Sequence, residues 1–423
     1  MSLATTPLDS PDFESIDDVD LTDLDLFKSG LPTDVFRALR EKDPVHWTPP
    51  PSEWATTTDP GGYWAVTSYE DVVAISKDVE TFSAHDGFFL NRDTDAANPV
   101  EVLRSTLTGM QPPQHTTYRA LLAPPFRPTA IASLEDTIRA RMTHIVDRLL
   151  DNSDADLVQD VAIPLPTEVI TDFLGFPEDA TEQVFRWGVD MAVIQDSDVS
   201  GGQEGGHRAL RELVAYTADL AEQRRRTPTN DLLSHLANAE IHGSRLTDDQ
   251  LAQFLAQLIV AGTETSRNTI AVGVKVLQET GQWDLLVDDP SLIPNAVEEC
   301  LRWTSSIIYM RRTATRDTEL HGRSIKKGDK VVQYLAAANR DPELNDDPEK
   351  FDILRKPIRH VSFGGGGARY CVGAGLARTQ IRIALEELIR RAPRLSITGD
   401  ATWLRSNWVS GLWKLPITAN PRS

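Results

Sequence analysis

Residues 360–375 combine one cysteine with a run of glycines and an arginine, a set that could hold a cofactor. Arg369 stands two residues before Cys371, and glycines occupy positions 364–367, 373 and 375. A phosphate-binding loop is not indicated, because neither G-x-x-x-x-G-K-[ST] nor G-x-G-x-x-G matches these glycines. A zinc site would need more Cys or His ligands, and only His360 is near. Two interpretations remain: a functional thiolate, or an inert cysteine in a glycine-rich turn.

A helix that directly follows this segment favours the functional thiolate. Its apolar positions recur with helical spacing, at Leu376, Ala377, Ile381, Ala384, Leu385, Leu388 and Ile389. Cys371 therefore precedes a helix N-terminus, whose free N–H groups and positive dipole end favour a thiolate and predict a lowered pKa for the thiol. The glycines present no Cβ, so a flat cofactor could approach the backbone.

An acid and an alcohol stand side by side within a second, longer helix. Residues 247–250 form a capping box, and the apolar pattern then runs over residues 251–277, a helix of roughly 45 Å. Its middle reads Ala-Gly-Thr-Glu-Thr at residues 261–265. Buried polar groups cost free energy unless they are paired or functional. Either Glu264 and Thr265 are catalytic, or Thr265 bonds to its own helix and Glu264 pairs with Arg267.

The remaining chain must position these residues, and its pattern predicts one large domain that is mainly α with minor β. Helical periodicity dominates residues 129–390, and strands are expected at 63–67, 330–334 and 413–418. No Pro/Gly/Ser linker divides the chain, so residues 29–423 are expected to form a single domain. Residues 1–28 are rich in acids and are predicted to be a disordered leader.

Composition excludes several functional classes. The charge is 43 − 63 = −20, which argues against a nucleic-acid partner. Two cysteines cannot form a disulfide framework, and no apolar run reaches the length of a transmembrane helix. The acidic start does not match a signal peptide, so a cytoplasmic protein without a membrane anchor is predicted.

Residues 360–375 resemble the haem-binding signature of the cytochrome P-450 family, F-x-x-G-x-[RH]-x-C-x-G, in a bacterial variant with one more glycine. Gly367, Arg369, Cys371 and Gly373 match its landmarks, while Phe363 lies eight residues before the cysteine and not seven. Residues 261–265 are similar to the family's oxygen-activating motif, A-G-x-[DE]-T, and residues 299–302 fit its E-x-x-R motif. The resemblance covers roughly residues 30–420, with the motifs in the family's order.

The resemblance implies the cytochrome P-450 fold, with haem b between the long central helix and the helix after the cysteine loop. Cys371 is then the axial ligand of the iron. Thr265 is expected to donate a hydrogen bond during oxygen activation, and Glu264 to deliver protons. The implied cofactor-binding residues are His115, Arg119, Ala261, Gly262, Arg312, Gly364, Arg369, Cys371 and Gly373, with the four cations at the haem propionates. The implied structural residues are Glu299, Arg302 and Arg355.

The implied activity is a monooxygenase that inserts one atom of O2 into a C–H bond of a hydrophobic molecule. Electrons are expected from NAD(P)H through a ferredoxin and its reductase, with Arg369, Arg378 and Arg382 near the docking face. The expected substrate is a steroid side chain or a methyl-branched lipid, and a terpenoid is the alternative. A non-catalytic haem or lipid carrier is the alternative of another class. The resemblance places the pocket walls at Phe88, Phe89, Ile259, Val260, Ile307, Ile308, Trp408 and Val409.

Overall fold

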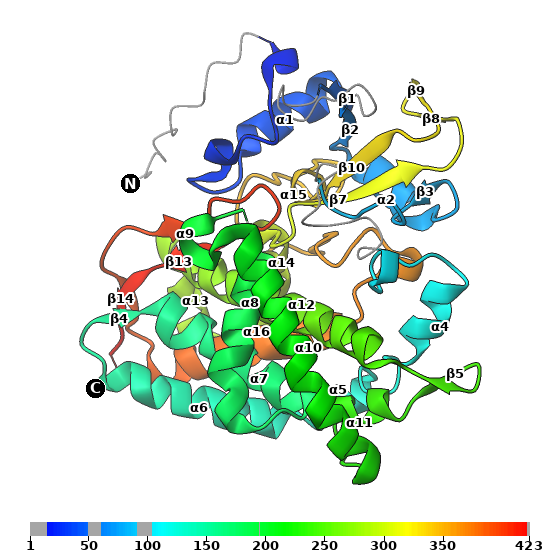
Figure 1. The fold of residues 1–423 in the computed structure, drawn as a ribbon. Coiled ribbons are helices and arrows are strands. Elements are labelled where there is room, and N and C mark those ends of the chain that lie inside the picture. The colour runs from blue at the N-terminus through cyan, green and yellow to red at the C-terminus, as the bar shows by residue number, and fades with distance from the viewer. Residues whose placement is uncertain (1–14, 50–60, 91–103, 194, 421–423) are drawn as a thin grey trace.

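The computed structural model describes residues 15–49, 61–90, 104–193 and 195–420, and helices form most of this part of the chain (Figure 1). The larger sheet lies to one side of the helices, together with the N-terminal elements. The helices are α1 (Thr33–Lys42), α2 (Tyr69–Lys77), α4 (Gln114–Ala120), α5 (Pro128–Ala132), α6 (Glu135–Asp151), α7 (Pro164–Leu174), α8 (Thr181–Ala192), α9 (Ser197–Ser200), α10 (Gly202–Arg226), α11 (Leu232–Ala237), α12 (Asp248–Glu279), α13 (Gln282–Asp288), α14 (Ile293–Thr304), α15 (Leu335–Ala338) and α16 (Ala374–Arg391).

The larger sheet joins strands from the first and last thirds of the chain in the order β1-β2-β10-β7-β3. Lys330 of β10 lies opposite Tyr63 of β2 in the parallel pair, and the other pairs are antiparallel. The predicted strands at 63–67 and 330–334 are present, whereas the one predicted at 413–418 is divided into two strands that belong to different sheets. The strands are β1 (Val45–Thr48), β2 (Tyr63–Val66), β3 (Phe82–Ser83), β4 (Ala155–Asp156), β5 (Glu240–Ile241), β6 (Ser244–Arg245), β7 (Tyr309–Ala314), β8 (Thr318–Leu320), β9 (Arg323–Ile325), β10 (Lys330–Tyr334), β11 (Ser396–Ile397), β12 (Thr402–Trp403), β13 (Leu412–Lys414) and β14 (Pro416–Thr418).

Helix α12 is the central element of the core. Its predicted capping box is confirmed: the amide of Gln250 donates to Thr247 Oγ1 at 3.2 Å, and the amide of Thr247 donates to Gln250 Oε1 at 3.0 Å. The helix has 32 residues and is therefore about 48 Å long. It packs against α7, α8, α10, α14 and α16. This arrangement confirms the predicted fold class and brings α12 close to the helix that follows Cys371.

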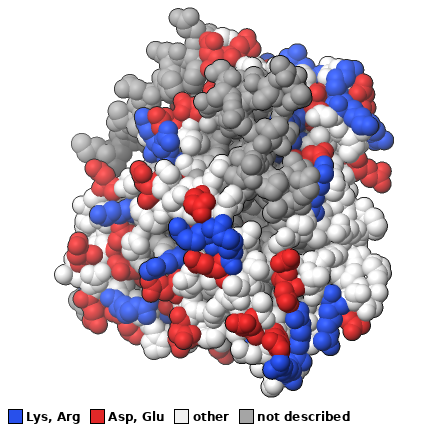
Figure 2. All heavy atoms as spheres, in the orientation of Figure 1, with Lys and Arg blue, Asp and Glu red and all other residues white. Residues whose placement is uncertain are grey.

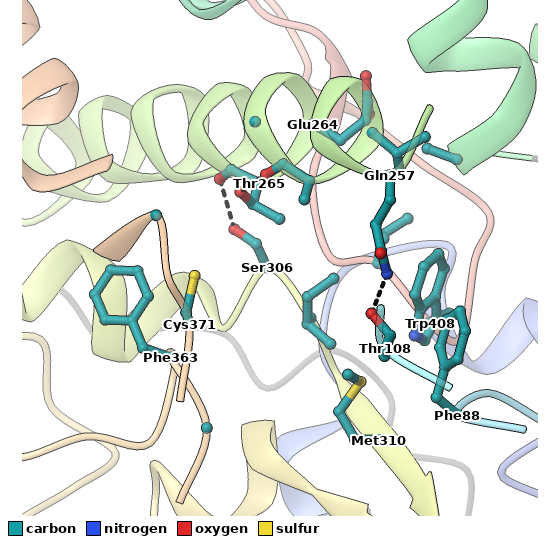
Figure 3. Close-up of a pocket in the computed structure, with 18 of the residues that line it drawn as sticks. Phe88, Thr108, Gln257, Glu264, Thr265, Ser306, Met310, Phe363, Cys371 and Trp408 are labelled. Atoms are coloured by element: carbon teal, nitrogen blue, oxygen red, sulfur yellow. Dashed lines mark hydrogen bonds between the residues drawn. The ribbon is translucent and has the colours of Figure 1, made fainter. Parts of the chain in front are cut away.

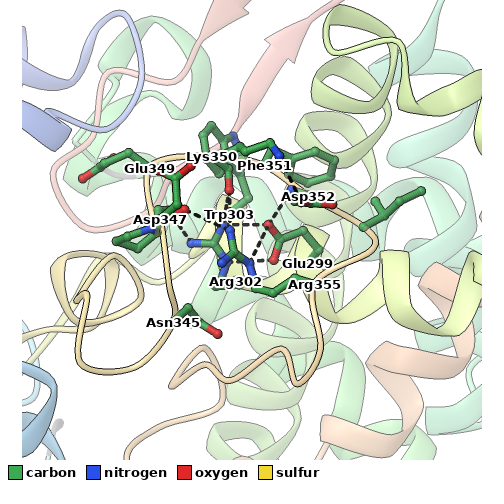
Figure 4. A network of polar contacts seen from close by, with 12 residues as sticks. Glu299, Arg302, Trp303, Asn345, Asp347, Glu349, Lys350, Phe351, Asp352 and Arg355 are labelled. Carbon is green, nitrogen blue, oxygen red and sulfur yellow. Dashed lines mark hydrogen bonds and ion pairs between the residues drawn. The ribbon is translucent and has the colours of Figure 1, made fainter.

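A buried network of ion pairs and hydrogen bonds connects α14 to the loop that follows α15 (Figure 4). The side chains of Glu299 and Arg302 are fully buried, with contacts of 2.7 and 2.8 Å, and Arg355 Nε lies 3.7 Å from Glu299 Oε1. Arg302 also donates to the carbonyls of Pro348 at 2.8 Å and Lys350 at 3.1 Å. A buried charge pair is tolerated when hydrogen bonds satisfy its remaining polar atoms, as these carbonyls do here. The E-x-x-R pair therefore stabilises a turn of irregular backbone.

The leader from Ser15 onward is folded, so the prediction of disorder over residues 1–28 is wrong for residues 15–28. Two short 3-10 helices form, η1 (Ile16–Asp18) and η2 (Leu24–Phe27). Leu21 is 0% exposed and Phe27 is 2% exposed, and both pack in a cluster with residues of α1 and β10. The acids between them face outward, which is how an acidic segment can still bury its apolar residues. Residues 1–14 lie outside the described residues.

Charged residues are interspersed over the face shown in Figure 2, where acids and bases alternate without a large area of one sign. None of the described helices combines the length and the apolar character that crossing a bilayer requires. The part of this face that is described therefore offers no broad cationic area for phosphate backbones.

Candidate active site

A cavity of about 1180 Å³ lies between α12 and the glycine-rich loop before α16. Thr265 faces it from α12 and Cys371 faces it from the loop on the opposite side (Figure 3). Phe88 and Trp408 lie at the end of the cavity away from Cys371. The cavity therefore has a thiol and a hydroxyl at one end and aromatic rings at the other.

The Cys371 thiol opens onto this cavity, and its side chain is accessible from there although protein surrounds it on most sides. The amide of Cys371 donates to the carbonyl of Phe363 at 2.9 Å, which fixes the turn before α16. Burial raises the pKa of the thiol, and this outweighs the amides of Gly373 and Ala374 and the positive charge of Arg119, which lower it. The expected lowered pKa is thus wrong for the protein without a metal. A thiolate here needs a further cation, and a coordinated metal ion would provide it.

The glycine-rich loop has a backbone that side chains would disrupt. Gly364, Gly366 and Gly367 have φ of +94°, +96° and +74°, in the region that favours glycine. A Cβ on Gly365 would lie 2.6 Å from the hydroxyl of Ser76 in α2. Phe363 lies beside Cys371 although it stands eight residues before the cysteine (Figure 3). The loop thus offers the cavity a surface of backbone beside the thiol.

Four cationic or ionisable side chains, from different elements, line the cavity: His115, Arg119, Arg312 and Arg369. Within the described part of the chain, none of the four forms an ion pair with a carboxylate. Burial, followed by the neighbouring Arg369, lowers the pKa of Arg312 to about 9, and burial lowers that of Arg369 to about 10. His115 Nδ1 and Arg369 Nε are buried without a hydrogen-bond partner among the described residues. Such a cluster calls for an anion.

These features fit haem. The macrocycle is flat and would lie against the glycine backbone on one side and the Ala261 turn of α12 on the other. Its two propionates are the anions that the cation cluster lacks, and its iron accepts a thiolate. Gly364 and Gly373 line the cavity beside the thiol, as the resemblance implies.

Glu264 and Thr265 make the contacts expected if they were purely structural, which was one of the two interpretations left open by the sequence. Thr265 Oγ1 donates to the carbonyl of Ala261 at 2.8 Å, and Glu264 Oε2 lies 2.6 Å from Arg267 Nη2. Thr265 points toward Cys371, whereas Glu264 leaves α12 on another side (Figure 3). Burial raises the pKa of Glu264, although Arg267 lowers it. Both side chains border the cavity, so these contacts describe a resting arrangement that does not exclude catalysis.

Gly262 borders the cavity, and close packing between two helices explains why a glycine fits at this position. A Cβ at this position would lie 2.8 Å from Ile170 of α7. The absence of a side chain therefore allows α12 to approach α7 closely, which the sequence alone does not show.

Six of the eight predicted wall residues line the cavity, namely Phe88, Phe89, Val260, Ile307, Trp408 and Val409. Ile259 and Ile308 do not, and the prediction for these two is wrong. Ile259 lies one helix turn before Thr263, and both face Gly188 of α8. Ile308 follows Ile307 in extended backbone, so its side chain points the other way, into the core beside Tyr309.

The polar or flexible lining residues that were missed in the sequence include Thr108, Gln257, Ser306 and Met310. Gln257 Nε2 donates to Thr108 Oγ1 across the cavity, and Ser306 Oγ donates to the carbonyl of Thr265 at 3.0 Å (Figure 3). Gln257 could have been found, because it stands one helix turn before Ala261 on the same face. Thr108 and Met310 carry no comparable signal in the sequence.

The fold and this site define a haem-thiolate protein, and comparisons with known proteins agree. The family profile of cytochrome P-450 matches residues 287–409. The methyl-branched lipid omega-hydroxylase of Mycobacterium tuberculosis is 36% identical and covers 95% of each chain. The steroid C26-monooxygenase of Mycolicibacterium smegmatis is 35% identical, over 95% of this chain and 94% of the relative.

A solved structure is also similar. The cytochrome P-450 of Mycobacterium marinum in complex with pseudoionone has a TM-score of 0.86 and 36% identity, covering 91% of this chain and 94% of the other. The chain belongs to the cytochrome P-450 family. It is a haem-dependent monooxygenase.

Proposed function

We propose that this enzyme hydroxylates the methyl-branched end of a lipid or a steroid side chain. The observation that carries the proposal is the part of the cavity wall away from the thiol, which Phe88, Phe89, Ile307 and Val409 make apolar. The rings of Phe88 and Phe89 are 5.1 Å apart, and Phe89 lies 5.8 Å from Trp408. An apolar chain gains free energy on entering such a wall. The two relatives named above oxidise substrates of this kind.

Cys371 would ligate the haem iron, and the four cations would hold the propionates. We infer a b-type haem, because a c-type haem needs cysteines that bond covalently to the macrocycle. The chain has two cysteines, and the second, Cys300, is buried against Gly273 in the core. Thiolate-ligated haem supplies the reductive activation of dioxygen, and the protein residues orient the substrate and control the protons.

Thr265 and Glu264 would control proton delivery. The Thr265 hydroxyl now donates to Ala261, and a rotation of its side chain directs the same proton into the cavity. Glu264 can take up a proton on the carboxyl oxygen that does not face Arg267, because burial raises the pKa of this carboxyl. The pair with Arg267 keeps that carboxylate in place until a proton arrives.

The test of this role is Thr265→Ala, with Thr263→Ala as the matched control. Thr263 makes the same bond to its own helix, from Oγ1 to the carbonyl of Ile259 at 2.9 Å, but it faces α8. We expect Thr265→Ala to retain haem and to release more hydrogen peroxide per NADPH consumed, with less product. An unchanged product yield per NADPH in Thr265→Ala would refute the role.

We propose that the electrons come from NAD(P)H through a separate ferredoxin. Two of the arginines expected at the docking face are already paired: Arg378 with Glu298 at 2.7 Å, and Arg382 with Glu135 and Glu386, each at 2.8 Å. Docking would therefore use shape and weaker charge contacts more than free arginines. Product formation that requires an added ferredoxin and its reductase supports the proposal. Equal turnover without the ferredoxin contradicts it.

The substrate class is tested by titrating the haem-bound protein with three ligands and recording the Soret band. A sterol ketone, phytanic acid and pseudoionone represent steroids, methyl-branched lipids and the terpenoid alternative. The terpenoid alternative is included because a similar solved structure contains bound pseudoionone. We expect the sterol ketone or phytanic acid to give the larger blue shift at the lower concentration. A shift with pseudoionone alone would favour the terpenoid function.

A further inference from the structure

The folded leader forms part of the cavity wall. Thr22 and Leu24 line the same cavity as Cys371 and Thr265, and Gln195 and Asn407 lie beside them in the lining. The sequence places the leader more than three hundred residues from the cysteine, and nothing in its acidic composition points to a ligand. Its contribution arises from packing alone.

A series of hydrogen bonds shows where the leader lies relative to the end of the cavity that contains Cys371 and Thr265. Ser306 Oγ donates to the carbonyl of Thr265 at 3.0 Å, and the amide of Ser410 donates to the carbonyl of Ser306 at 2.9 Å. The amide of Ile308 then donates to the carbonyl of Trp408 at 2.9 Å. The loop of residues 405–410 therefore runs along the cavity from the Thr265 end to the Trp408 end, which Figure 3 shows away from Cys371.

The leader is attached to the far part of this loop. Asn407 Nδ2 donates to the carbonyl of Leu21 at 3.1 Å, and Arg405 Nε lies 2.6 Å from Asp25 Oδ1. Gln195 Nε2 donates to Asn407 Oδ1 at 2.8 Å, which ties the end of α8 to the same point. Leu21 is fully buried, so the backbone on either side of Thr22 is held in place. The leader thus forms the cavity wall beside Asn407 and Trp408.

We propose that Leu24 is a specificity-determining residue that limits the length of the substrate. The far end of the substrate, opposite the carbon that is oxidised, would contact the leader at Leu24. The ligand class that this predicts is an elongated apolar molecule that spans from the haem to the leader. The inference rests on the proposed function, because it takes the cavity to hold both haem and substrate.

Leu24 can be altered without removing the packing of the leader. It is half-buried and faces the cavity, while Leu21 and Phe27 anchor the segment in the core. Leu26 is the matched control, because it belongs to the same short helix, is also half-buried and packs against the neighbouring cluster without lining the cavity.

The experiment uses 1-alkylimidazoles of increasing chain length to measure how long a chain the cavity of the haem-bound protein accepts. Their ring nitrogen binds haem iron and shifts the Soret band to the red, so the alkyl chain starts from a known point. The dissociation constants of the butyl, octyl, dodecyl and hexadecyl compounds are measured for the wild type, Leu24→Trp, Leu24→Ala and Leu26→Trp. The shift with the butyl compound reports haem ligation without contact with the leader.

We expect Leu24→Trp to weaken binding of the longest chains about tenfold, because overfilling a packed wall is costly. Butyl binding should stay unchanged, Leu24→Ala should favour the longest chain, and Leu26→Trp should match the wild type. Equal effects of Leu24→Trp on short and long chains, or no effect on any, would overturn the proposal. A wild type that gives no shift even with the butyl compound would overturn the haem assignment itself.

Discussion

Arg312→Met should weaken haem retention and stabilise the haem-free protein, two effects of opposite sign. Arg312 lies on β7, is 5% exposed and has no carboxylate partner among the described residues. Burial and the neighbouring Arg369 lower its pKa from 12.5 to about 9. At 1.36 kcal/mol per pH unit, this corresponds to about 5 kcal/mol against the charged form when no anion is bound. Met keeps most of the aliphatic volume and removes the charge.

On the proposed function, a haem propionate would supply the missing anion, so the variant would lose one partner of a buried ion pair. Such a loss costs about 3–5 kcal/mol. The other three side chains of the cluster also line the cavity and would still be available to the propionates, so we expect the lower end of this range. At about 1.4 kcal/mol per tenfold, haem should leave the variant about 10²-fold faster.

The assay is haem transfer to an excess of apomyoglobin, followed by the Soret absorbance. Urea denaturation of the haem-free proteins measures the second effect. Arg316→Met is the control, because Arg316 follows the same strand but is exposed and outside the cavity. A haem-transfer rate equal to that of the wild type would refute the reasoning, and so would a haem-free variant that is less stable than the wild type.

Three further predictions concern buried charge and thiol chemistry. Glu299→Gln leaves buried Arg302 without its charge partner, so urea unfolding of the haem-bound protein should show a loss of about 3–5 kcal/mol; an unchanged midpoint would contradict this. Burial and neighbouring guanidinium groups lower the pKa of His115 from 6.5 to about 4. The His115 site should therefore cost the haem-free protein stability as the pH falls from 6.5 to 4, because the unfolded chain takes up the proton first, and His115→Gln should make the loss of stability with falling pH smaller. A disulfide reagent should label Cys371 in the folded haem-free protein, because this side chain is accessible from the cavity, but should not label Cys300, which is buried in the core; labelling of Cys300 before unfolding would be the contrary result.

Local signals in the sequence determine where the chemically active groups stand along the chain. The capping box at residues 247–250 sets the start of α12, and helical spacing then places Glu264 and Thr265 in its middle. The stripe that begins at Leu376 places Cys371 directly before α16. These features depend on neighbours within a few residues, so periodicity and capping chemistry are sufficient to predict them.

The tertiary structure alone decides what faces the cavity and how its groups ionise. Ile259 and Val260 are adjacent on one helix, yet only Val260 lines the cavity, because α8 covers the face of its neighbour. Burial reverses the pKa shift that the helix N-terminus predicts for Cys371. The leader becomes part of the cavity wall because Asn407 donates a hydrogen bond to the carbonyl of Leu21, 386 residues away in the chain. Burial and contact join segments that are distant in sequence, and local patterns do not encode which surfaces those segments share.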